Sequence, residues 1–84
     1  MGKELVGKVA HYFNKAGVAV IELTGPLNVG DRISIEGGGH SFEQTVESMQ
    51  IEHENIQSAT AGQSIGLKTA EKAHAGNKVY KVTE

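Results

Sequence analysis

A short turn-and-strand pattern occurs three times in this chain, and it restricts the fold more than any other feature of the sequence. Leu27–Ile35 reads LNVGDRISI, and the segments 61–67 and 75–79 repeat its order: a glycine, a side chain able to bond to the backbone, a polar residue and a β-branched residue. Glycine adopts positive φ at little cost, and the alternation that follows is typical of a half-buried strand. The glycines stand at 30, 62 and 76, a spacing too uneven for a solenoid. The pattern therefore predicts one small antiparallel barrel whose strands begin in the same way.

Alternation of apolar and polar side chains predicts the strands themselves. They cover residues 5–13, 18–23, 32–36, 42–51, 65–67 and 78–82. The strand 18–23 is largely apolar on both faces, which predicts a central position in the sheet. Gly7 predicts a bulge or a close backbone neighbour, and a change of apolar phase within 42–51 predicts a bulge or sharp bend near Glu47-Ser48.

Turn chemistry separates these strands. Residues 14–17 predict a hairpin turn with positive φ at its glycine, and 24–26 end the second strand at a proline. The glycines of 37–40 predict a hairpin tip, because no lysine stands near them to complete a phosphate-binding loop. Residues 56–61 form a connection with room for one helical turn. No window has a sustained apolar period of 3.6 residues, so no long helix is expected.

The sequence thus predicts an all-β fold in a single domain over residues 1–84. We expect a small antiparallel β-barrel of about six strands, closed or nearly closed, with Greek-key-like connections. The interior of so small a barrel is filled by side chains. The predicted core consists of Val9, Ala19, Ile21, Leu23, Leu27, Ile33, Ile35, Val46, Met49, Ile65, Leu67 and Val79.

Bulk composition restricts the environment and the partners. The chain has no cysteine, which is typical of a reducing compartment, and no apolar run long enough to span a bilayer. We therefore expect a cytoplasmic protein without a membrane partner. The net charge of −2 argues against strong non-specific binding of nucleic acid. The oligomeric state stays open.

Charged residues are unevenly distributed. Five glutamates and no Lys or Arg lie between Ile33 and Leu67, whereas the lysines lie in the first and last segments. If the first and last strands are neighbours, this distribution predicts one basic end and one acidic flank. A solvated surface with unevenly placed lysines is the alternative.

No pattern predicts catalysis. No serine stands in a nucleophile signature, and the four histidines are scattered at 11, 40, 53 and 74. A phosphate-binding loop ending in Gly-Lys-Ser/Thr is absent from the sequence. We expect no catalytic residues, no metal site, no cofactor and no nucleotide binding.

The sequence resembles the second-domain β-barrel of translational GTPases such as elongation factor Tu and initiation factor two. The segments that carry this resemblance are 7–9, 27–33, 46–50, 59–67 and 76–79. The run 45–53 resembles the small free-standing translation elongation factor-like proteins, and the C-terminal barrel of some collagenase-like peptidases is similar too. The first resemblance implies a barrel that faces tRNA or ribosomal RNA, without a GTPase domain.

Two functional hypotheses follow. The first is an RNA- or ribosome-associated binding module whose contacts are lysines of the basic end: Lys8, Lys68, Lys78 and Lys81. The second is an adaptor barrel that docks on a larger enzyme or factor with no role in RNA binding. Its candidate contacts, in and near the acidic stretch, are Glu47, Met49 and His53.

Overall fold

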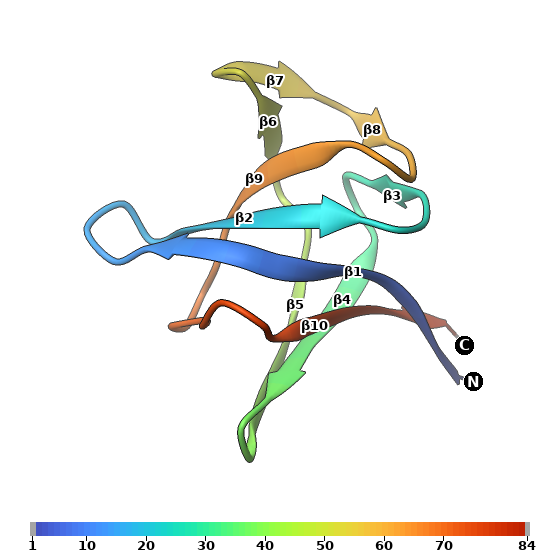
Figure 1. Ribbon diagram of the computed structural model, residues 1–84. Coiled ribbons are helices and arrows are strands. Elements are labelled where there is room, and N and C mark those ends of the chain that lie inside the picture. The colour runs from blue at the N-terminus through green and yellow to red at the C-terminus, as the bar shows by residue number, and fades with distance from the viewer. Residues whose placement is uncertain (1, 84) are drawn as a thin grey trace.

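The computed structural model describes residues 2–83, which form ten strands and no helix that could cross a membrane (Figure 1). Met1 and Glu84, the ends of the predicted domain, lie outside the described residues. The strands are β1 (Gly2–Phe13), β2 (Val18–Leu23), β3 (Leu27–Asn28), β4 (Arg32–Gly37), β5 (His40–Thr45), β6 (Met49–Ile51), β7 (Glu54–Ile56), β8 (Ser58–Ala59), β9 (Ser64–Lys68) and β10 (Lys78–Thr83).

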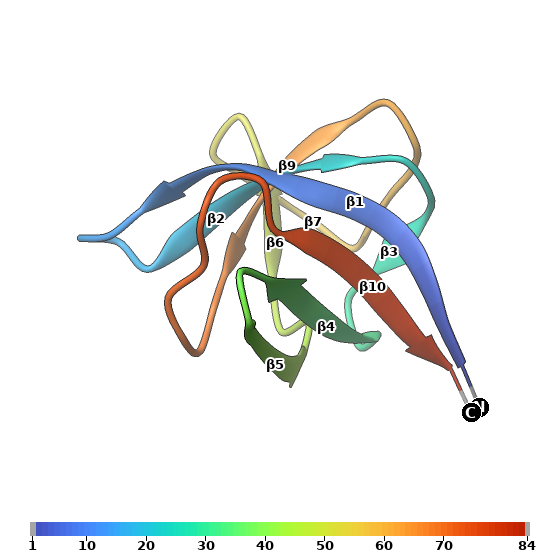
Figure 2. The same ribbon diagram turned by 60° about the horizontal axis from the view of Figure 1, so that its bottom comes forward.

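Eight strands form one curled antiparallel sheet in the order β5-β4-β10-β1-β2-β9-β6-β7, and β3 pairs with β8 beside it. The all-β class, the antiparallel pairing and the lack of a long helix are confirmed for residues 2–83. The prediction of a closed barrel is wrong, because the hydrogen-bonded sheet is open, with β5 and β7 at its edges. The first and last strands, β1 and β10, are neighbours as expected, so the two described ends lie together (Figure 2).

The predicted strand 42–51 is divided into β5 and β6. Residues 46–48 carry the chain from one edge of the sheet, where β5 pairs with β4, to β9, where β6 pairs. The sharp bend predicted near Glu47-Ser48 is therefore present, but it is a complete change of partner. Residues 56–61 contain short strand segments in β7 and β8 instead of a helical turn.

Two irregularities in β1 change which side chains enter the core. The register shifts between Leu5 and Gly7 against β10, and again between Val9 and His11 against β2. A Cβ atom at Gly7 would lie 2.7 Å from a backbone oxygen of β2, so the predicted close approach is confirmed. Because of the first shift Val6 is buried while Leu5 is 48% exposed.

The three repeated turns have the same conformation and the same hydrogen bonds. Their glycines have φ of 99°, 92° and 94°. In each turn the side-chain oxygen after the glycine accepts a hydrogen bond of 2.8–3.0 Å from the backbone N–H three residues earlier. The residues concerned are Gly30 and Asp31, Gly62 and Gln63, and Gly76 and Asn77.

Each of these turns is also joined to one buried residue elsewhere in the chain by a pair of backbone hydrogen bonds. The glycine N–H donates to the carbonyl oxygen of this buried partner. The N–H of the partner donates to the carbonyl oxygen of the residue after the glycine, and all six distances are 2.7–2.9 Å. The buried residues are Val46, which follows β5, Leu23 of β2 and Val9 of β1, in chain order of the turns. The repeated sequence pattern therefore marks three equivalent junctions that draw the sheet around one core.

A single hydrophobic cluster fills the interior. Every residue of the predicted core is buried, including Met49 at 1% exposure. The cluster also contains residues that the sequence analysis did not include: Val6, Phe42, Ala59 and Ala73. Ala59 and Ala73 occupy the same position before their turns as Leu27 does before the first, so the repeat itself could have identified them.

Candidate functional site

The four lysines proposed for RNA binding do not form one surface. Lys8 and Lys78 are directly opposite each other on β1 and β10, but Glu22 and Glu36 are their next cross-strand neighbours. The pair is thus flanked by carboxylates on both sides. Opposite charges in cross-strand positions reduce the positive potential that a phosphate backbone would meet.

The other two lysines lie elsewhere. The ammonium of Lys81 is 3.5 Å from a carboxylate oxygen of Asp31, and both side chains are about three-quarters buried. Lys68 ends β9 opposite Val18. Neither is therefore part of a common basic end with Lys8.

The three adaptor candidates also separate in space. Met49 belongs to the core and offers no side-chain surface to a partner. Glu47 is exposed beside one groove of the surface, and His53 is exposed beside another. We call the first, which the Gln44 side chain spans, the polar groove, and the second, which Phe13 lines, the apolar groove.

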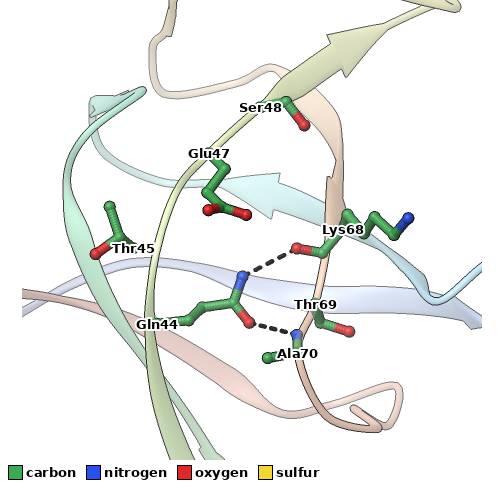
Figure 3. Close-up of a pocket in the computed structure, with 7 residues that line it drawn as sticks. All are labelled: Gln44, Thr45, Glu47, Ser48, Lys68, Thr69 and Ala70. Atoms are coloured by element: carbon green, nitrogen blue, oxygen red, sulfur yellow. Dashed lines mark hydrogen bonds between the residues drawn. The ribbon is translucent and has the colours of Figure 1, made fainter.

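The polar groove lies where the sheet fails to close, between β5 and the segment that follows β9 (Figure 3). It has a volume of about 480 Å³. Gln44 spans it: its amide nitrogen donates to the carbonyl oxygen of Lys68 at 2.9 Å, and its amide oxygen accepts from the N–H of Ala70 at 2.7 Å. Glu47 points into the same opening. The oxygen and the nitrogen of the Gln44 amide both form hydrogen bonds across the groove, so this side chain joins its two walls.

The apolar groove, which we call the Phe13 groove, lies on the outer face of β2, β9 and β6. It has a volume of about 500 Å³, and its lining residues are Phe13, Ala16, Val18, Val20, Gln50, Glu52, His53, Ser64, Ile65 and Gly66. The Phe13 side chain is 49% exposed and packs edge-on against the His11 ring, with centroids 4.4 Å apart. Exposed apolar patches of this kind mark interaction sites more often than isolated exposed residues do.

The register places the floor of this groove at Gly66. Val20 faces Gly66 across β2 and β9, and Gly66 faces Gln50 across β9 and β6. A Cβ atom at Gly66 would meet its nearest neighbours at 3.5 and 3.8 Å, which are ordinary contacts. No close approach in the fold requires glycine here, yet glycine in a strand costs about 0.5–1 kcal/mol relative to alanine. The missing side chain keeps the groove deep.

The rim of the Phe13 groove carries a backbone conformation that is unfavourable for its residues. Glu52 and His53 form the two-residue turn between β6 and β7 with φ of 50° and 67°. Gly38 and Gly39 form the equivalent turn between β4 and β5 with φ of 60° and 78°. Such turns strongly favour Asn and Gly. The chain thus places two ionisable side chains beside the groove at positions where glycine would be less strained.

Sequence analysis did not identify this groove. The one signal for it was the apolar character of both faces of β2, from which a central strand was predicted. β2 does lie inside the sheet, between β1 and β9. Its outward residues Val18 and Val20, however, are only half-buried, and no other layer covers them.

The charged groups whose pKa values shift clearly lie away from both grooves. Lys3 forms an ion pair with Glu36, and the Ser34 hydroxyl donates to the same carboxylate at 2.7 Å. The hydrogen bond from Lys3, together with that from Ser34, lowers the pKa of Glu36 below its ordinary range, and the pKa of Lys3 is raised in turn. Within residues 2–83 no three His, Asp or Glu side chains converge as metal ligands would.

No family model matches the chain. It is 36% identical over 80 residues to an uncharacterized protease of Methanocaldococcus jannaschii, and 37% identical over 81 residues to a collagenase of Porphyromonas gingivalis. Each match covers 94% of this chain but only 20% and 22% of the relative. The chain therefore spans about a fifth of the length of the curated proteins that it matches.

Solved structures with the same fold agree with these matches. The C-terminal domain of a protein of Geobacillus thermoleovorans classed as a U32 peptidase superposes with a TM-score of 0.89 at 22% identity, covering 95% of this chain and 93% of that one. Its selenomethionine variant gives 0.86, with 90% and 96% covered. At this identity the likeness establishes the fold.

These matches correct the first resemblance stated above. Assignment to the translation factors, as an elongation factor-like protein or a second-domain barrel, is wrong, because the similar sequences are an uncharacterized protease and a collagenase. The RNA- or ribosome-associated function inferred from that assignment, with tRNA or ribosomal RNA as partner, is withdrawn with it. The similarity noted to barrels of collagenase-like peptidases agrees with the matches.

Proposed function

We propose that this chain is a non-catalytic docking domain that binds the body of a larger protein of the peptidase class through the Phe13 groove. The observation that carries this proposal is the 49% exposure of Phe13 on an apolar groove. The matched proteases support it, since in them the corresponding segment is joined to a body about four times its length. The adaptor hypothesis from the sequence is thereby retained, with a contact surface that includes His53 but neither Glu47 nor Met49.

The strength of such a contact can be estimated. Full burial of a Phe side chain contributes about 1.5–3 kcal/mol, so covering the exposed half of Phe13 contributes about 1 kcal/mol. Alone this gives little affinity. A covalent tether supplies an effective concentration in the millimolar range, at which a contact of about 4 kcal/mol is half populated, so the rest of the groove would have to contribute about 3 kcal/mol. The docking proposal therefore fits a domain attached to its partner better than one that captures it from dilute solution.

A chimera tests the proposal. The segment of the Porphyromonas gingivalis collagenase that matches this chain is replaced by the chain itself, and hydrogen exchange is compared between the chimera and the isolated chain. We expect slower exchange at 13–20 and 64–66 in the chimera, because these segments line the groove. Equal exchange in both contexts at these segments would contradict docking through this groove.

A matched pair of variants identifies the contact. Phe13→Ser should abolish the added protection, whereas Leu5→Ser should leave it unchanged. Leu5 is the other large exposed apolar residue, at 48%, and does not line the groove. A second readout tests the non-catalytic part of the proposal: the isolated chain should not cleave gelatin, and cleavage by the purified chain would overturn it.

A further inference from the structure

The outer face of the sheet around the Phe13 groove consists of three cross-strand rows. The first runs from Lys8 through Glu22 to Ser64, the second from His11 through Val20 and Gly66 to Gln50, and the third from Phe13 through Val18 to Lys68. Neighbouring rows are two residues apart along β2 and β9, which is roughly 7 Å in an extended strand. Glu52 lines the groove together with Ser64, at the end of the first row.

We propose that the Phe13 groove binds an extended polypeptide segment that carries an apolar side chain and, two residues away, a Lys or Arg. This inference rests on the proposed function, because the segment would belong to the larger protein. The apolar side chain sits over Gly66, beside Val20 and Val18 of β2, with Phe13 beyond them on β1. The basic side chain reaches the carboxylates of Glu22 and Glu52.

The apolar half of this site follows from the second and third rows. Gly66 has no side chain, and the half-buried Val18 and Val20 form the wall beside it. Phe13 adds an aromatic face at the end of the groove. A side chain the size of Leu placed on Gly66 would cover apolar surface of Val18 and Val20, and covering such surface is favourable in proportion to its area.

The charged residues around the groove determine where the basic group of the ligand lies. Glu22 and Glu52 are exposed, and neither is within 4 Å of a cationic nitrogen of the described residues. Lys68 stands at the opposite end, in the third row. Lys8 begins the first row on β1, beside Glu22, so a basic group is attracted to the end of this row near Ser64 and Glu52 and is repelled from Lys68 in the third row.

The spacing indicates an extended segment. In an extended chain, side chains at i and i+2 point the same way and lie roughly 7 Å apart, which equals the distance between adjacent rows. An apolar side chain over the second row thus places its i+2 neighbour over the first. Side chains at i and i+3 of a helix lie about 5–6 Å apart and fit this spacing less well.

Three capped heptapeptides test the ligand class by NMR titration of the amide signals of the full chain. Their central residues are Leu-Ser-Lys, Leu-Ser-Glu and Ser-Ser-Lys. The first should shift the amides of Val18, Val20 and Gly66, and at low salt should bind at least about threefold more tightly than the second, because one contact is attractive and the other repulsive. The third should bind more weakly than the first, since it lacks the apolar side chain.

Variants distinguish the electrostatic contribution to peptide binding from the apolar contribution. The double substitution Glu22→Gln with Glu52→Gln should remove the preference for Lys, as should high salt. Glu4→Gln with Glu47→Gln makes the same change in net charge outside the groove and should preserve it. Phe13→Ser should weaken both Leu peptides.

Each contrary outcome has a distinct meaning. Equal binding of the Lys and Glu peptides at Val18, Val20 and Gly66 would overturn the basic specificity while leaving the groove as a docking site. Equal binding of the Leu-Ser-Lys and Ser-Ser-Lys peptides would overturn the specificity for an apolar side chain. Absence of shifts at these amides at millimolar peptide would overturn the ligand class. Exchange protection in the collagenase chimera decides the proposed function independently of all three results.

Discussion

The side-chain amide of Gln44 accepts a 2.7 Å hydrogen bond from the backbone N–H of Ala70, across the opening where the sheet does not close. Its nitrogen donates to the carbonyl oxygen of Lys68 at 2.9 Å. A glutamine thus takes the place that a strand-to-strand ladder would occupy in a closed barrel. The two edges of the opening are joined at this point by a side chain and not by paired backbones.

Replacing Gln44 should therefore loosen this side of the molecule. In Gln44→Leu the N–H of Ala70 and the carbonyl of Lys68 lose a partner each, and we expect a loss of about 1–2 kcal/mol in the free energy of unfolding. Urea denaturation measures the loss, and amide exchange should accelerate at Ala70 before global unfolding. Gln57→Leu is the control, because no hydrogen bond joins the Gln57 side chain to another described residue. Equal effects of the two substitutions would contradict a bridging role for Gln44.

The three repeated turns predict that replacing the glycine of each will lower the stability of the fold by a similar amount. Gly30→Ala, Gly62→Ala and Gly76→Ala each force a residue with a Cβ atom into φ near 95°, and each should destabilise the fold by about 1–2 kcal/mol. Thermal unfolding of the three variants measures this. Gly66→Ala is the contrasting control: its new Cβ would make only ordinary contacts, so its stability should equal or exceed that of the parent. A large loss at Gly66 would show that the glycine is needed for the fold.

The turn at Glu52-His53 should respond in the opposite direction. Because both residues occupy the left-handed region, Glu52→Asn combined with His53→Gly should raise the free energy of unfolding by about 1–2 kcal/mol. Chemical denaturation of the double variant checks this. The same variant should show a weaker preference for the Lys peptide, since Glu52 is gone while Glu22 remains. A variant that is no more stable than the parent would show that the turn relaxes its strain through contacts of these side chains.

The ion pair of Lys3 and Glu36 predicts a defined dependence on pH. The folded protein lowers the pKa of Glu36, so the pair stabilises the fold above the ordinary glutamate pKa. This stabilisation is lost as the pH falls through the lower pKa of the folded state. Carbon-detected NMR titration should show the pKa of Glu36 rising toward its ordinary value in Lys3→Gln. Ser34→Ala should give a smaller rise, because the Lys3 contact is the larger cause.

The sequence predicts the interior of this protein far better than its surface. Leu27, Ile33 and their counterparts are identified by a local pattern, since a turn with a glycine at positive φ constrains the residues on both sides of it. Sheet closure is different, because it depends on how far β5 diverges from the chain after β9, and no local residue encodes that distance. The Phe13 groove was missed for the same reason: whether Val18 faces solvent or another layer is decided by elements distant in sequence.

Gly2 and Thr83 are directly opposite each other in the β1–β10 ladder. An entering and a departing polypeptide would therefore meet at one corner, and Phe13 stands at the far end of the same twelve-residue strand. Such a domain is suited to insertion within a loop of a host protein as well as to fusion at either end. In each case the linker would emerge at the end of β1 opposite Phe13, and the groove would stay uncovered.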